Sequence, residues 1–527
     1  MNISPKYHPD RHANVCLILE GTYPYIRGGV SSWVKQLIDG MPELTFSIIF
    51  LGGHADDYDE PAYEIPDNVV HIEVRFLLGD EDATTPQKKK FWQRKADKKA
   101  LFTRNHQLHD QLADTGNALD NTVVHDFTSL LAGPNALQRS DLYHGEDAWE
   151  TVRSKYIDAP SGLDFNHYFW TVRTMHSPLF TLGEIAGNPP SADVYHSVST
   201  GYAGYLGAML KSKTNKPYFV TEHGIYTKER EIDLAHVDWI PDELDPYRVG
   251  LDDSMGFLRQ TWIRFFKSLG RMTYSSADHV YTLFEGNRQR QIEDGVNENA
   301  LTIIPNGVNV EKLRQVRRPD NAAIPPVLAL IGRIVPIKDI KTFIRGMRVV
   351  CAKLPQAQGW LVGPEDEDPD YVAECRAMVH SFGLEDSVKF LGFQNLERVF
   401  PQVGLTVLTS ISEGQPLTTL EGFAAGIPAI TTDVGSCRDL IHGCNEHDKQ
   451  LGSAGATIPI ANPGLFAEAS IALLTDGKSW REASAVARKR VETYYDEKDM
   501  LQRYSDIYLD GIASGSRLNT YKQAEGF

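Results

Sequence analysis

The stretch that decides the fold runs from Leu405 to Pro428 and reads LTVLTSISEGQPLTTLEGFAAGIP. Its first four residues form a short apolar run that is typical of a buried strand. Pro416 suits the first turn of a helix, and Gly426 with Pro428 ends that helix. The stretch therefore predicts one strand and one helix of an α/β fold.

The same strand and helix pattern recurs along the chain. Short apolar runs rich in Val, Ile, Leu and aromatic residues occur at Asn14–Glu20, Phe46–Leu51, Asp193–His196, Tyr218–Glu222, His279–Phe284, Val327–Ile331, Trp360–Val362, Val388–Leu391, Leu405–Leu408 and Ala429–Thr432. Most of these runs are separated by stretches in which apolar residues have helical spacing. The predicted fold class is therefore α/β, with parallel sheets covered on both faces.

Two domains are expected because 527 residues exceed what one hydrophobic core ordinarily holds. We place the N-terminal domain at residues 1–317 and the C-terminal domain at residues 318–498. A large insertion is expected at about 78–192, where strand signals are weak and charges are frequent. The basic run Lys88–Lys95 inside it could dock a protein or a polyanionic acceptor, or it could be a solvated helix face. The last helix, 499–527, is long enough to pack back on the first domain.

The whole-chain composition excludes several classes of protein. A formal net charge of −17 disfavours a nucleic-acid or anionic-membrane binder, which would need a basic face. Five scattered cysteines are too few for a disulfide framework. The N-terminus lacks the apolar core of a signal peptide, and no stretch reaches the roughly 20 apolar residues of a membrane span. We therefore expect a cytoplasmic protein with no nucleic-acid partner.

Two carboxylates in the opening stretch point to a binding site. Glu421 lies on the apolar side of the predicted helix, one turn after Leu417, so its carboxylate is aimed inward. An unpaired buried charge is costly, so Glu421 needs a partner, and paired ribose hydroxyls would serve. Glu413 lies in the loop after a strand, where open α/β sheets bind ligands, and nearby helix-start amides can receive phosphate. The alternative is a surface Glu413 and a Glu421 paired with a neighbouring helix.

A basic pair follows the first strand of the second domain. Arg333 offers a planar fork and Lys338 a point charge, which together suit a diphosphate leaving group and could replace a metal ion. The alternative is that both side chains lie in solvent. The acidic runs Asp80-Glu81-Asp82 and Asp366-Glu367-Asp368 mimic metal-binding pairs. Their surroundings favour solvated loops, so no metal site is predicted.

Two further motifs belong to the first domain. Gly28 and Gly29 precede a helix and would let the backbone approach a phosphate or a sugar. The string is neither a GxGxxG fingerprint nor a P-loop, which disfavours a nicotinamide dinucleotide or an ATP-cleaving site. His223 follows the strand that begins near Tyr218 and could bind a sugar hydroxyl or position an acceptor. A turn without a ligand and a merely packed histidine are the alternatives.

Together these motifs resemble the retaining GT-B glycosyltransferases of family four. In the second domain the resemblance rests on Arg333 with Lys338, Gly363-Pro364, Phe390-Leu391-Gly392-Phe393, and Glu413 with Glu421 seven residues apart. The first domain resembles more closely the PelF-type enzymes of Pel exopolysaccharide biosynthesis. That resemblance rests on the strings Leu19–Tyr25, Arg27–Trp33 and Glu222–Tyr226. The resemblance is weakest over the insertion at about 78–192.

The resemblance implies a GT-B fold, with two Rossmann-like domains facing each other across a cleft. The N-terminal domain would be on the acceptor side, and the C-terminal domain would bind the nucleotide-sugar. The implied activity is the transfer of a hexose from a UDP-sugar to a growing Pel-type exopolysaccharide, with retention of anomeric configuration and without a metal or another cofactor. Its partners would be a UDP-hexose, a polysaccharide acceptor and exopolysaccharide synthesis proteins that recruit it to the inner membrane.

The resemblance also implies roles for single residues. Arg333 and Lys338 would hold the diphosphate, Glu421 the ribose, and Phe393 with its neighbours the uracil. Glu413 would grip the donor hexose and His223 would line the sugar site, so these two complete the catalytic set with Arg333 and Lys338. The other binding residues expected are Gly28, Gly29, Gly363, Gly414, Pro416 and Leu417. No residue is named as a covalent nucleophile.

Two other functions stay open at this point. UDP-sugar epimerases share the two-domain architecture, and a non-catalytic subunit could merely sense a nucleotide-sugar. The sequence does not choose between glucose, galactose and their N-acetyl derivatives. UDP is preferred over ADP or GDP by resemblance alone, and the acceptor and the oligomeric state stay open.

Overall fold

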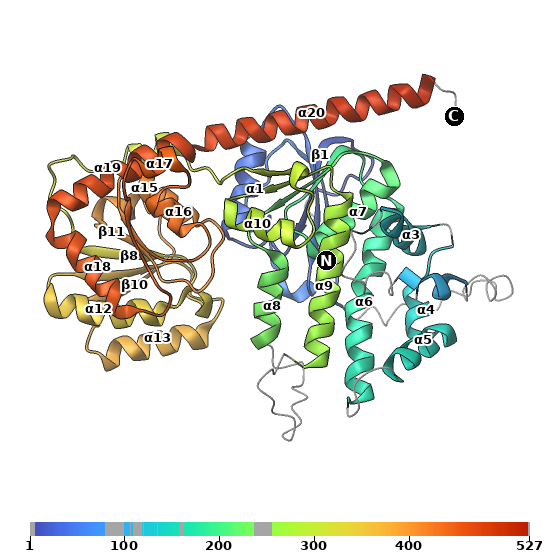
Figure 1. The fold of residues 1–527 in the computed structure, drawn as a ribbon, viewed down its shortest axis with the longest axis horizontal. Coiled ribbons are helices and arrows are strands. Elements are labelled where there is room, and N and C mark those ends of the chain that lie inside the picture. The colour runs from blue at the N-terminus through green and yellow to red at the C-terminus, as the bar shows by residue number, and fades with distance from the viewer. Residues whose placement is uncertain are drawn as a thin grey trace. The chain divides into compact units, whose positions relative to one another are not determined.

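A computed structural model describes residues 6–79, 100–105, 107, 108, 119, 121–133, 135–157, 163–236 and 256–524. The chain divides into two compact units (Figure 1). Unit 1 comprises Met1–Thr282, Arg288–Ile303 and Tyr504–Phe527, and unit 2 comprises Leu283–Asn287 and Ile304–Arg503. Each unit contains a parallel sheet of its own.

The described part of unit 1 contains a sheet of seven strands in the order β3-β2-β1-β4-β5-β6-β7. The strands are β1 (Ala13–Glu20), β2 (Phe46–Gly52), β3 (Val69–Phe76), β4 (Ala192–Ser197), β5 (Tyr218–Glu222), β6 (His279–Thr282) and β7 (Leu301–Ile303). All neighbouring pairs are parallel. The chain winds outward from β1 to β3 and then returns to β4 on the other side of β1. The switch point of this sheet therefore lies between β1 and β4.

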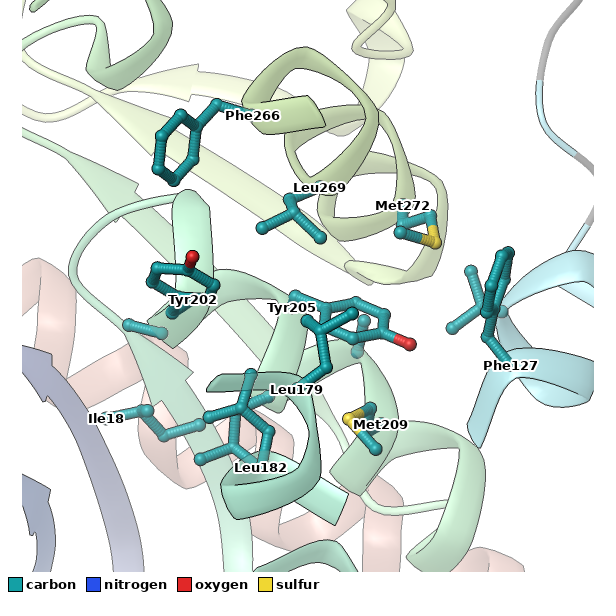
Figure 2. Close-up of a cluster of buried hydrophobic side chains, with 14 of the residues drawn as sticks. Ile18, Phe127, Leu179, Leu182, Tyr202, Tyr205, Met209, Phe266, Leu269 and Met272 are labelled. Atoms are coloured by element: carbon teal, nitrogen blue, oxygen red, sulfur yellow. The ribbon is translucent and has the colours of Figure 1, made fainter. Parts of the chain in front are cut away.

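Helices cover both faces of this sheet. The described helices between β1 and β7 are α1 (Gly29–Gly40), α3 (Asn121–Ala132), α4 (Arg139–His144), α5 (Glu146–Ile157), α6 (Phe165–Gly187), α7 (Gly201–Thr214), α8 (Tyr226–His236), α9 (Phe257–Ser276) and α10 (Glu285–Glu293), with 3-10 turns at Ala55–Asp57 and Glu298–Ala300. Figure 2 shows side chains from α3, α6, α7 and α9 converging around the buried Tyr205. Phe127 of α3 and Leu182 of α6 belong to this core, so helices within the predicted insertion are built into unit 1. The runs Lys88–Lys95 and Asp80-Glu81-Asp82 lie outside the described residues.

The described part of unit 2 contains a sheet of six parallel strands in the order β10-β9-β8-β11-β12-β13. The strands are β8 (Val327–Ile331), β9 (Gln358–Val362), β10 (Val388–Gly392), β11 (Leu405–Leu408), β12 (Ala429–Thr432) and β13 (Gly455–Ile458). The helices are α11 (Val310–Arg314), α12 (Ile340–Lys353), α13 (Pro369–Ser381), α14 (Leu396–Val399), α15 (Leu417–Ala424), α16 (Cys437–His442), α17 (Glu446–Lys449), α18 (Pro463–Thr475) and α19 (Gly477–Tyr494), with 3-10 turns at Pro336–Lys338 and Phe400–Gln402.

Alternation along the strands of unit 2 produces two cores, one on each face of the sheet. In β8, Leu328 and Leu330 belong to the core that contains residues of α12, α13 and α18, whereas Val327 and Ala329 belong to the core that contains residues of α15, α16 and α19. Side-chain caps fix several helix starts, for example Asp476 before α19. The two-faced burial explains why these strands read as continuous apolar runs in the sequence.

The last helix, α20 (Glu497–Ala524), begins in unit 2 and belongs to unit 1 from Tyr504 onward. Its buried Tyr508 hydroxyl lies 2.6 Å from Nδ1 of His196 in β4, and its buried Tyr504 hydroxyl lies 3.0 Å from the Thr221 hydroxyl in β5. Aromatic side chains with a polar tip bury large areas while satisfying their hydroxyl groups. These contacts fix α20 on the sheet of unit 1.

The predicted α/β fold class with parallel sheets is confirmed. The predicted domain boundary lay between residues 317 and 318, and the division into units falls between Ile303 and Ile304. The segment between these positions contains α11, whose Val310 and Leu313 are buried in the core of unit 2. No described helix combines the length and the apolar character needed to cross a membrane.

Candidate functional site

The predicted residues of unit 2 lie at the carboxyl ends of four adjacent strands. Phe393 follows β10, Gly363 follows β9, Arg333 follows β8 and Glu413 follows β11. The chain winds from β8 outward to β10 and then crosses to β11 on the other side of β8. The switch point of the sheet therefore lies between β8 and β11, where open α/β sheets bind their ligands.

Close backbone contact joins the loops after β8, β9 and β10. Gly363 has a φ of +157°, and a Cβ atom there would lie 1.9 Å from the carbonyl oxygen of Gly332. The Gly363 amide donates to the Gly392 carbonyl at 2.9 Å, and the Gly332 amide donates to the Val362 carbonyl at 2.9 Å. Only glycine tolerates this approach. Gly363 thereby fixes the backbone from which Arg333 extends.

Lys338 and Glu413 form an ion pair across the switch point. The Lys338 ammonium donates to Oε1 of Glu413 at 2.5 Å, and the Ser410 hydroxyl donates to the same oxygen at 2.6 Å. The side chains are 21% and 12% exposed. Thr409 donates to the carbonyls of Lys338 and Asp339 and so ties the two loops together. A phosphate arriving at Lys338 would compete with Glu413 for the ammonium group and free Oε1 for another donor.

Arg333 forms its ion pair with Glu367 of the acidic run Asp366-Glu367-Asp368, and not with Glu413. Its Nη1 lies 2.6 Å and 2.8 Å from the two carboxylate oxygens of Glu367, and both side chains are more than two-fifths exposed. Exposed pairs of this kind stabilise by at most about 1 kcal/mol, so a ligand can recruit Arg333 at little cost. Asp368 caps α13 by accepting the Tyr371 amide at 2.9 Å. No cluster of three or more His, Cys, Asp or Glu side chains that could hold a metal ion occurs among the described residues.

The Glu421 side chain is half-buried on α15. Burial raises its pKa to about 7, and the distant positive charge of Lys312 opposes this only in part. Within the described ranges the carboxylate has no hydrogen bond or ion pair, and Lys312 is itself paired with Glu397 at 2.6 Å. The internal partner that the alternative reading requires is thus absent from the described part of the chain. The Glu421 oxygens retain unused hydrogen-bonding capacity.

The loop before α15 is held from two sides. Gly414 accepts the amide and the hydroxyl of Ser436 at 2.9 Å and 3.1 Å, and the Gln415 side chain accepts the Asn306 amide at 2.6 Å. Pro416 precedes the helix, which begins at Leu417 without a side-chain cap. The uncapped amides of the first turn can bind an anion.

Three positioning residues of unit 2 were missed in the sequence: Asn306, Ser410 and Ser436. Ser410 follows β11 almost directly, so its place at a strand end was an available signal. Asn306 lies in the loop between β7 and α11, for which the sequence suggests no role in a site. Nothing local in the sequence identifies Ser436, whose partner lies 22 residues away.

Gly28, Gly29 and His223 belong to unit 1. Both glycines are exposed, and a Cβ atom at either would meet nothing within 4 Å. The helix that they begin, α1, has no side-chain cap. Packing therefore does not explain the glycine pair, whereas a close approach by a ligand would.

His223 packs against the helix that the glycine pair begins. Its ring centroid lies 4.6 Å from that of Trp33 in α1, at an interplanar angle of 77°. Burial lowers the pKa of His223 to about 4, although the Val198 backbone acts in the opposite direction. The imidazole is therefore neutral near pH 7 and can exchange hydrogen bonds with a hydroxyl group. The neighbouring Glu222 is buried and accepts from Thr200 and Gln291 at 3.1 Å and 2.7 Å, which fixes the start of this loop.

Two family models match the chain. The model described as Domain of unknown function (DUF3492) matches residues 13–299, which is more than half of the chain. The model described as Glycosyl transferases group 1 matches residues 325–476. Arg333, Lys338, Glu413 and Glu421 all lie inside the second match. Unit 2 therefore carries a group 1 glycosyl transferase domain.

Two curated relatives are similar to parts of the chain. The exopolysaccharide phosphotransferase of Streptomyces coelicolor is 29% identical over 172 residues, which cover 32% of this chain and 17% of that protein. The N,N'-diacetylbacillosaminyl-diphospho-undecaprenol alpha-1,3-N-acetylgalactosaminyltransferase of Campylobacter jejuni is 24% identical over 282 residues, 50% of this chain and 70% of that protein. The chain thus spans less than one fifth of the Streptomyces protein.

A solved structure shares the fold over nearly the whole chain. Alr3699/HepE of Anabaena, in complex with UDP and glucose, has a TM-score of 0.55 at 14% identity, and the similarity covers 94% of this chain and 99% of that one. Together with the two parallel-sheet units, this similarity confirms the predicted GT-B fold class.

Proposed function

The chain belongs to the family described as Domain of unknown function (DUF3492), and we propose that this protein is a retaining glycosyltransferase that uses a UDP-sugar. The observation that carries the proposal is the Glu421 carboxylate, whose pKa is raised by burial and which has no internal partner in the described part of the chain. Glu421 belongs to α15, the helix that follows β11 at the switch point of a group 1 glycosyl transferase domain. Ribose hydroxyls would donate to it and offset its burial.

The other residues of unit 2 suit the remaining parts of a UDP-hexose. Lys338 and Arg333 would bind the diphosphate, because each is held only by a carboxylate that an oxyanion can replace. Phe393 is 69% exposed at the end of β10 and would pack against the uracil ring. The choice of UDP is supported by the Anabaena structure, which contains UDP and glucose.

We propose the following reaction at these residues. The bond between C1 of the hexose and the diphosphate oxygen breaks, and the electron pair leaves with UDP. The acceptor hydroxyl forms the new bond on the same face, and its proton passes to the departing phosphate oxygen. Lys338 and Arg333 stabilise the negative charge that builds on the diphosphate, so we propose a transfer that needs no metal ion. Glu413 would hold a hexose hydroxyl, while Gly28, Gly29 and the neutral His223 would line the sugar and acceptor side.

We further propose a growing Pel-type exopolysaccharide as the acceptor, in the cytoplasm, with recruitment to the inner membrane by synthesis proteins. The resemblance of Leu19–Tyr25 and Glu222–Tyr226 to PelF-type enzymes supports this acceptor. The names of the Streptomyces and Campylobacter relatives also refer to an exopolysaccharide and to a lipid-linked sugar.

The proposal is tested by incubating the purified chain with UDP-glucose, UDP-galactose or their N-acetyl derivatives and an oligosaccharide acceptor. We expect acceptor-dependent UDP release with one donor, an α-linked product by NMR, and the same rate after treatment with EDTA. Glu421→Gln should raise the KM for the donor, whereas Glu468→Gln, an exposed residue of α18, should not. No transfer from any of the donors, or epimerisation of a donor without acceptor, would overturn the proposal.

A further inference from the structure

A pocket in unit 2 is lined by arginine side chains. It has a volume of about 270 Å³ and lies where α15 ends and α19 begins. We call it the arginine pocket, after its basic lining residues Arg317, Arg318, Arg481 and Arg488. It lies at the opposite end of α15 from Leu417, at which the candidate donor site begins.

Positive charge exceeds negative charge in this pocket. Asp320 is the one carboxylate among its lining residues, and it pairs with Arg488 at 3.0 Å. Arg318 donates to the Val403 carbonyl at 2.6 Å, which is a neutral partner. Arg481 is exposed and has no ion pair or hydrogen bond within the described ranges. A cluster of like charges is unfavourable in any protein, and it is conspicuous in a chain whose net charge is −17.

Two of the arginines are also partly desolvated. Burial lowers the pKa of both Arg317 and Arg318. Arg317 pairs with Glu492 at 2.9 Å, yet its buried Nη2 has no hydrogen-bond partner in the part of the chain that the structure describes. An unused buried donor costs roughly 1–3 kcal/mol. A ligand that supplies oxygen acceptors would recover part of this cost.

Helix capping accounts for only one of these arginines. Nε of Arg317 donates to the Ala424 carbonyl at 2.7 Å, as expected of a cation at a helix C-terminus. The neighbouring Gly426 carbonyl is satisfied by the Ser484 hydroxyl at 2.6 Å. The end of α15 therefore needs nothing from Arg481 or Arg488. These two residues are seven positions apart on α19, so they lie on the same face of the helix.

We propose that the arginine pocket binds the phosphoryl group of a small molecule. Guanidinium groups match the geometry of phosphate oxygens and form paired, charge-assisted hydrogen bonds with them. Arg481 supplies an uncommitted guanidinium, and Arg488 can be shared between Asp320 and the ligand. The volume of about 270 Å³ accommodates a phosphate with a small organic group attached.

Calorimetric titration of the full chain with inorganic phosphate, a hexose phosphate and acetate tests this proposal. We expect the phosphates to bind and acetate to give no heat. Tighter binding of the hexose phosphate would identify an organic phosphate as the occupant, and equal binding would identify phosphate itself. Arg481→Gln should weaken phosphate binding about tenfold, which corresponds to the loss of one charge-assisted contact. Because Arg481 is exposed, this variant should unfold at the same temperature as the wild type.

A control variant separates the pocket from the basic surface elsewhere. Arg345→Gln removes the same charge from an exposed position on α12, and it should bind phosphate as the wild type does. The proposal is overturned if no phosphate compound binds, if Arg481→Gln binds normally, or if Arg345→Gln loses as much affinity as Arg481→Gln.

Discussion

Binding of a UDP-hexose should release a proton from Glu421. The carboxyl has a pKa of about 7 in the free protein, and it must be ionised to accept hydrogen bonds from two ribose hydroxyls. At pH 6 it is roughly nine-tenths protonated and at pH 8 roughly one-tenth. The affinity for the donor should therefore rise about tenfold from pH 6 to pH 8, or about 1.4 kcal/mol.

Calorimetry in two buffers of different ionisation enthalpy measures this proton directly. A UDP-hexose is preferable to UDP, because its diphosphate has no group that titrates in this range. We expect close to one proton released at pH 6 and almost none at pH 8. Glu421→Gln should abolish the pH dependence, and this comparison also removes any contribution from Glu229, whose pKa is likewise raised to about 7 by burial. A proton count near zero at pH 6, or the same count in the Gln variant, would show that Glu421 does not ionise when the donor binds.

Three further predictions concern stability and the ion pair at the switch point. Because the folded-state pKa of Glu421 is raised, its ionisation destabilises the fold as pH rises above about 4.5. In urea unfolding, Glu421→Gln should therefore be more stable than the wild type by roughly 1–3 kcal/mol at pH 8 and equally stable at pH 4. Gly363→Ala should lower the unfolding free energy by roughly 3 kcal/mol or more, whereas Gly383→Ala, also at positive φ but with open space around it, should cost only about 1 kcal/mol. Ser410→Ala removes one of the two donors to Glu413, and it should lower kcat about tenfold and the unfolding free energy by only about 1 kcal/mol; an unchanged kcat would separate this contact from the reaction.

The central strands could be predicted from the sequence, whereas of the four edge strands only β10 could. β1 and β8 are buried on both faces and appear as continuous apolar runs. β3 lies at an edge and alternates apolar residues with His71, Glu73 and Arg75, so its composition resembles a polar segment. β7 and β13 are also edge strands, of only three and four residues. Short strands at an edge carry too few residues for a periodic signal.

The sequence predicts which residues belong to the candidate site, but it does not predict which of their side chains form ion pairs. Strand ends and helix starts located Arg333, Lys338, Glu413 and Glu421, because these positions follow from local periodicity. The pairing of Lys338 with Glu413 joins residues 75 positions apart, and it depends on β8 and β11 being neighbours in the sheet. The arginine pocket has the same origin, since its lining residues come from separate segments that only the fold brings together.

The central claim is that Glu421 binds the ribose of the donor nucleotide. A thermodynamic cycle tests it most directly, with the Kd of UDP and of 2′,3′-dideoxyuridine diphosphate measured for the wild type and for Glu421→Gln at pH 8. We expect removal of the ribose hydroxyls to weaken binding at least about tenfold in the wild type and hardly at all in the variant. An equal loss in both proteins would contradict it.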